Sequence, residues 1–130
     1  MSNVVFNGHV HNYQRSYPLK FVPSAESGAA PNVGKVSRSR LVGGKWTLDK
    51  KFNGQSDTTP DGVIYLVTGA GGQHLYNPEQ QDNPSSWQEF TYKHVSKVHS
   101  LTVADVEGSR LTVRQLTADG DEVDRFVITK

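Results

Sequence analysis

The chain contains no cysteine, which excludes disulfide bonds and thiolate metal sites. Any metal ligand must therefore be an imidazole, a carboxylate, an amide or water. Long apolar runs are also missing, since no stretch approaches the roughly 18 residues that a membrane-spanning helix needs. An excess of one charge is missing too, because 14 basic residues accompany 13 acidic ones. This balance gives no reason to expect nucleic acid or a membrane as a partner.

A long amphipathic helix is also absent from the 130-residue sequence, so we expect one mainly β domain, α+β at most. Apolar runs and alternating patterns predict strands, separated by turn residues. The predicted strands span residues 4–7, 63–68, 101–106, 110–116 and 123–128. Between about residues 20 and 60 the composition predicts a loop-rich insert, with a short β pair around Gly43-Gly44 and Trp46 as its anchor.

Two histidines follow the first predicted strand. His9 and His11 are two positions apart, and such residues point to the same face of an extended chain. Imidazole is the commonest metal ligand near neutral pH, and Gly8 allows the backbone to bend where the strand ends. The spacing therefore predicts half of a metal site. A pair of surface histidines at a strand end is the alternative.

The surrounding residues strengthen the metal hypothesis. The histidines belong to the string Gly8-His9-Val10-His11-Asn12-Tyr13-Gln14-Arg15. This string resembles the last metal-binding block of calcineurin-like metallophosphoesterases, and is most similar to the Gly-His-x-His-x-Tyr-Glu-Arg block of the purple-acid-phosphatase branch. Gln14 stands where that branch usually has glutamate, at a position that is not a ligand in the family. The segment from Asp61 to Gly72 and the segment from His99 onward also resemble the family's later strand, glycine loop and terminal hairpins.

The resemblance implies a fold and a chemistry. In this family two metal ions lie about 3.5–4 Å apart and activate water for phosphate-ester hydrolysis. His9 and His11 would bind different ions in the intact αββα sandwich, or a single ion in this chain alone. Zinc suits imidazole best, with iron or manganese as further candidates. The family's other ligand blocks precede the Gly-His-x-His block. We therefore expect this chain to be the C-terminal part of a larger domain.

One sequence match to an upstream block is rejected. Gly120-Asp121-Glu122-Val123-Asp124 reads like a Gly-Asp-x-x-Asp block, but it follows Gly-His-x-His in the chain. Asp119-Gly120 between two apolar runs predicts a hairpin turn instead.

Further candidates for a ligand or substrate contact lie near the two predicted loops. They are His74, Arg15, Asn12, Gly71 and Gly72. Bracing of the histidine loop is the favoured role for Arg15. The glycines either present N–H groups to an anion or let the strand end pack beneath the histidine loop, and we favour packing. His94 and His99 are expected not to share a metal.

Three functions remain open. The first is metal-dependent hydrolysis of a small phosphate ester. The second is a non-catalytic oligomeric β-module that binds metal through His9 and His11. The third is a carbohydrate- or peptide-binding domain that uses Trp46, Trp87 and the tyrosines. Because the chain would retain about one sheet of the sandwich, either the face of Tyr65 or that of Ile64 and Leu66 should be uncovered, and self-association should cover it.

Overall fold

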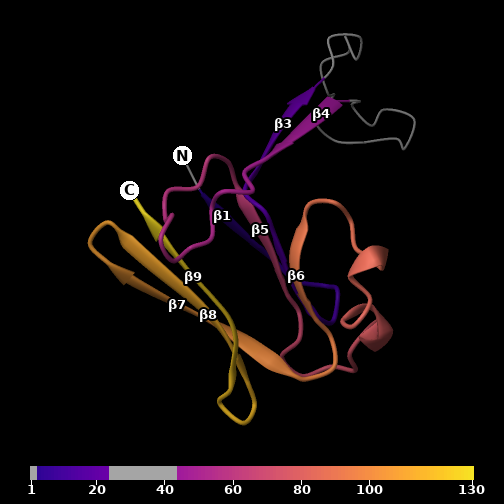
Figure 1. The fold of residues 1–130 in the computed structure, drawn as a ribbon. Coiled ribbons are helices and arrows are strands. Elements are labelled where there is room, and N and C mark those ends of the chain that lie inside the picture. Colours follow the sequence, from indigo (N-terminus) through magenta and orange to yellow (C-terminus); the bar gives the residue numbers. More distant parts are fainter. Residues whose placement is uncertain (1–2, 24–43) are drawn as a thin grey trace, which may run out of the picture.

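The computed structural model describes residues 3–23 and 44–130 of the chain. In these ranges the fold is mainly β, which confirms the predicted class, and three sheets account for its strands (Figure 1). The first sheet has the order β1 (Val4–Asn7), β5 (Ile64–Thr68), β2 (Tyr13–Ser16) and β6 (Thr91–Val95). The second is the hairpin of β3 (Leu19–Pro23) and β4 (Gly44–Leu48), and the third is the meander of β7 (Ser100–Glu107), β8 (Arg110–Thr117) and β9 (Glu122–Thr129).

The first sheet determines which loops meet. β1 and β5 are parallel, with Asn7 opposite Val67, so both strands end at the same edge of the sheet. The chain leaves β1 into the histidine segment and leaves β5 into the glycine segment. β2 then runs back antiparallel to β5 and pairs Tyr13 with Thr68. Two loops that are about 60 positions apart in the sequence are thereby brought together at one end of the sheet.

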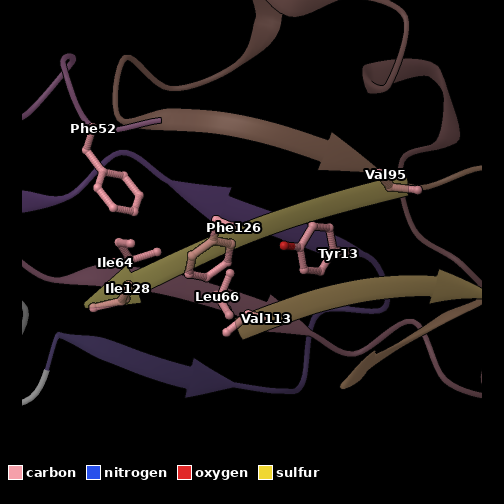
Figure 2. Close-up of a cluster of buried hydrophobic side chains, with 8 residues drawn as sticks. All are labelled: Tyr13, Phe52, Ile64, Leu66, Val95, Val113, Phe126 and Ile128. Carbon is pink, nitrogen blue, oxygen red and sulfur yellow. The ribbon is translucent and has the colours of Figure 1, made fainter. Parts of the chain in front are cut away.

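The hydrophobic core lies between the first sheet and the meander (Figure 2). Ile64 and Leu66 of β5 are fully buried, and they pack in one cluster with Phe126 and Ile128 of β9. Alternation along each strand directs these side chains inward. The complete cluster is Tyr13, Phe52, Ile64, Leu66, Val95, Val113, Phe126 and Ile128.

Of the two alternatives, an uncovered Ile64 and Leu66 face is therefore wrong, whereas Tyr65 on the opposite face is 42% exposed. The chain supplies both layers, because the meander folds back onto the first sheet (Figure 1). Antiparallel strands joined by short turns can form such a layer from local sequence. The sequence pattern predicted the strands, but it did not show that the meander packs against the first sheet. Self-association stays a prediction, but the buried face of Ile64 and Leu66 cannot be the surface that drives it.

The turn predicted at Asp119-Gly120 is confirmed. Gly120 has a φ of 87° and its N–H donates to Thr117 O at 3.0 Å. Asp124 lies in β9 and receives hydrogen bonds from Tyr13 and Arg15 of β2. This carboxylate is therefore engaged inside the fold.

The predicted insert is only partly described. Residues 24–43 lie outside the described ranges, and with them the first half of the β pair predicted around Gly43-Gly44. The second half is β4, which pairs with β3 and places Trp46 opposite Phe21. The β3–β4 hairpin projects away from the two packed layers (Figure 1). Among the described residues no helix is long and apolar enough to span a membrane.

Candidate metal centre

The histidine segment does not continue the strand. β1 ends at Asn7, and two tight turns follow: Val10 N–H donates to Gly8 O at 3.0 Å, and Asn12 N–H donates to Val10 O at 2.9 Å. Each histidine is the central residue of one turn. His9 has a φ of 75°, which makes its turn the rarer and more strained form of γ-turn. The predicted extended geometry is therefore wrong, because the chain must reverse between β1 and β2.

The tautomer of His11 follows from its hydrogen bond. His11 Nδ1 lies 2.9 Å from the carbonyl oxygen of His74. A carbonyl oxygen only accepts hydrogen bonds, so Nδ1 carries the proton and donates it. When the ring is neutral, Nε2 then has the free lone pair. A backbone carbonyl that fixes the ring in this way is the usual support of a metal-binding histidine.

Tyr76 holds the same residue from a second side. Its ring stacks on the His11 ring with centroids 4.2 Å apart and an interplanar angle of 20°. Its backbone N–H donates to His11 O at 2.9 Å. Tyr76 is not identifiable as a partner of His11 from the sequence, because nothing in a sequence pattern pairs residues that are 65 positions apart.

Asn12 is fully buried beside the histidines. Its side-chain amide donates to Tyr76 O at 3.5 Å, and its Oδ1 accepts a hydrogen bond from Gln14 Nε2 at 3.0 Å. The backbone N–H of Gly69 donates to Asn12 O at 3.1 Å. These contacts give Asn12 a structural role in tying the two loops together.

Gly69 is the glycine that the close packing of these loops requires. A Cβ at this position would lie 2.1 Å from the carbonyl oxygen of Val10, a distance that real Cβ atoms do not show. At Gly71 and Gly72 a Cβ would meet nothing within 4 Å. The packing role that we favoured for the glycine run therefore belongs to Gly69, and the two later glycines are exposed.

Arg15 links β2 to β9, and its favoured role as a brace of the histidine loop stays a prediction. Its side chain is 2% exposed and donates to both carboxylate oxygens of Asp124, at 2.7 and 2.8 Å. Its guanidinium also lies 4.0 Å from the centre of the Tyr92 ring. Burial lowers the pKa of Arg15, but Asp124, together with Tyr13 and Tyr92, raises it by more. The charge is thus satisfied inside the fold, which makes Arg15 a poor substrate contact.

The remaining histidines are dispersed. His74 offers its backbone carbonyl to His11, and its side chain is exposed. His99 Nε2 lies 3.0 Å from Gln73 O, so this ring supports the same loop. His94 is 4% exposed and stacks on Trp87 with centroids 5.9 Å apart. Burial lowers the pKa of His94, and the charge of Glu79 opposes that effect in part.

The donor set fits a divalent cation only in part. Within residues 3–23 and 44–130, no group of three or more histidine, aspartate or glutamate side chains is placed to hold a metal. His11 presents Nε2, and His9 is exposed on the neighbouring turn. Two imidazoles suit a late divalent ion. The other positions of a tetrahedral shell require water or ligands from beyond the described residues.

A separate groove lies on the other face of the first sheet. It has a volume of about 440 Å³. The aromatic residues among its lining are Phe21, Trp46, Tyr65 and Phe90. Trp87 is not part of this lining, because it packs on His94 and donates from Nε1 to Gln80 O at 2.6 Å. Trp87 therefore does not line the groove that Trp46 lines.

Comparison of the chain with family models, curated proteins and solved structures finds no match. The likeness to metallophosphoesterases thus rests on the motif residues alone.

Proposed function

We propose that the segment from Gly8 to Asn12 is the metal-binding loop of a metal-dependent phosphate-ester hydrolase. The observation that carries this proposal is the hydrogen bond from His11 Nδ1–H to the His74 carbonyl. This bond leaves Nε2 as the electron-pair donor that a cation needs. The Gly-His-x-His string and the glycine segment after β5 are the sequence features that accompany it. Zinc is the preferred ion, with iron and manganese as alternatives.

Different residues of the site would bind the metal ion and the phosphate group. His11, and His9 on the neighbouring turn, hold the cation. A bound divalent ion lowers the pKa of its water ligand and polarises a phosphoryl oxygen. Gly71 and Gly72 are exposed and leave open space above their backbone. That space allows a phosphate group to approach the main-chain N–H groups.

The incomplete ligand set favours a second form of the proposal. Two histidines alone would hold a cation without completing a catalytic shell, which is the behaviour of a non-catalytic module. Both forms require metal at His9 and His11. They differ in turnover of an activated phosphate ester such as bis(p-nitrophenyl) phosphate. Hydrolysis that a chelator abolishes and zinc or manganese restores supports the enzyme form.

Elemental analysis tests the shared part. The purified protein should contain a late divalent metal, and the double variant His9→Ala/His11→Ala should lose it. His94→Phe is the matched control, since it removes an imidazole that stacks on Trp87 and keeps an aromatic ring there. An unchanged metal content in the double variant would place the site elsewhere. Turnover that persists both with chelator and in His11→Ala would rule out the hydrolytic mechanism.

Self-association accompanies the non-catalytic form. Several large apolar side chains are more than two-fifths exposed, among them Phe21, Trp46 and Leu101. Sedimentation at micromolar concentration measures the mass. A compact, folded species of 14.3 kDa would contradict self-association and leave the metal proposal intact.

A further inference from the structure

The segment from Gln73 to Tyr76 contacts the histidine loop through several different groups. The His74 carbonyl accepts from His11 Nδ1, the Tyr76 N–H donates to His11 O, and the Tyr76 ring stacks on the His11 ring. We call these three contacts the clamp. Each contact restrains a different property of His11: its tautomer, its backbone position and its ring plane.

The clamp acts against two opposing tendencies. Neutral histidine in water favours the tautomer with the proton on Nε2. The Nδ1–H form therefore needs a hydrogen-bond acceptor at Nδ1 that stabilises it. The backbone at His9 is strained, with a φ of 75°, and such conformations persist only where surrounding contacts determine them. The clamp and the Gly69 N–H to Asn12 O hydrogen bond restrain the residues that directly follow His9.

Tyr76 reaches the surface beside His11. Its side chain is 44% exposed, and its ring stacks nearly parallel to an imidazole. Stacking fixes the plane in which the Nε2 lone pair points, because rotation of the imidazole would break the face-to-face contact. The orientation of a metal ligand is the property that such a contact controls.

We propose that the clamp preorganises His11 as the primary metal ligand, and that Tyr76 is a positioning residue of the site. The inference rests on the proposed metal-binding function and adds the residues that set its affinity. Loss of one such supporting contact reduces metal affinity by about 10- to 100-fold in other sites. Tyr76→Leu keeps the backbone hydrogen bonds and removes the ring. Tyr76→Phe keeps the ring and is the matched control.

Two measurements test the clamp. Side-chain nitrogen chemical shifts report the His11 tautomer in the metal-free protein, and calorimetric titration with zinc reports affinity. We expect the Nδ1–H tautomer in the wild type and in Tyr76→Phe. In Tyr76→Leu we expect a mixture of tautomers and zinc binding that is weaker by about tenfold or more. Thermal unfolding of Tyr76→Leu identifies a variant that fails to fold. Tyr76→Met, which is flexible and apolar, then takes its place.

The outcomes separate the two proposals. A wild-type His11 with its proton on Nε2 would overturn the clamp. Equal zinc affinity in Tyr76→Leu, Tyr76→Met and the wild type would overturn the positioning role of Tyr76. A protein that binds no zinc in any form would overturn the proposed function, and the chemical shifts would still decide whether the clamp holds His11.

Discussion

Arg15 and Asp124 lie 109 positions apart in the sequence, and their side chains form a two-point ion pair between the two packed sheets. Tyr13 donates from its hydroxyl to the same carboxylate at 2.7 Å. Burial raises the pKa of Tyr13, and the charge of Asp124 raises it further. The phenol therefore stays protonated as a donor. This cluster attaches β2, the strand that follows the histidine loop, to β9.

Removal of the Asp124 charge should destabilise the protein strongly. Asp124→Asn leaves the guanidinium of Arg15 buried without a counter-charge, and such a break costs about 3–5 kcal/mol. Chemical denaturation measures the free energy of unfolding. Glu122→Gln is the control, because it breaks the exposed pair of Glu122 with Arg125 and should change stability little. Equal losses of stability in the two variants would show that the buried ion pair contributes no more than the exposed one.

Substitution of Gly69 should disturb the site as well as the fold. A Cβ 2.1 Å from Val10 O forces the backbone of β5 and the histidine loop apart, at a cost of about 1–3 kcal/mol. Gly69→Ala should therefore unfold at a lower denaturant concentration and bind less metal. Gly71→Ala meets nothing within 4 Å and serves as control. Matching stability and metal content in the two variants would contradict the close approach.

The strain at His9 predicts an unusual order of stabilities. Glycine adopts a positive φ readily, whereas alanine does not. His9→Gly should therefore be more stable than His9→Ala by about 1 kcal/mol, although both variants lack the imidazole. Thermal unfolding of the metal-free proteins checks this order. Greater stability of the alanine variant would mean that the loop does not hold the positive φ in solution.

His94 predicts a loss of stability in mild acid. Its pKa is lowered in the folded state, so the unfolded chain binds the proton more tightly. The contribution of neutral His94 to the free energy of unfolding is complete above the pKa of histidine in the unfolded chain, about 6.5. It is lost as the pH falls below that pKa. One proton changes the free energy of unfolding by at most about 1.4 kcal/mol per pH unit. Urea unfolding between pH 7.5 and pH 5 measures this dependence.

His94→Phe is the variant that isolates this effect. Phenylalanine keeps an aromatic ring against Trp87 and removes the titration. The difference in stability between wild type and variant should therefore shift with pH over the acid range only. A difference that stays constant from pH 7.5 to pH 5 would show that His94 does not carry the dependence.

Local sequence patterns predicted much of the strand content. Alternating or continuous apolar runs identified β1, β5 and the three strands of the meander to within a few residues. Asp119-Gly120 identified the last turn. Such features depend on neighbours in the sequence, because strand periodicity and turn chemistry are local properties. The partner of the Ile64 and Leu66 face was not local, so the sequence left open which face of β5 is covered, and only the tertiary structure shows that this face is.

The candidate site also has features that follow from the sequence and features that follow only from the tertiary structure. The sequence by itself determined which side chains can donate to a metal: it has no thiol, and it places His9 and His11 together after a strand. Tertiary structure decided that the histidines occupy tight turns. It also decided that the His74 carbonyl sets the tautomer of His11, and that the backbone of Val10 packs closely against Gly69. The last two features depend on contacts between segments about 60 residues apart. The physical reason is that residue type fixes the available chemistry, whereas folding fixes the direction in which each lone pair points.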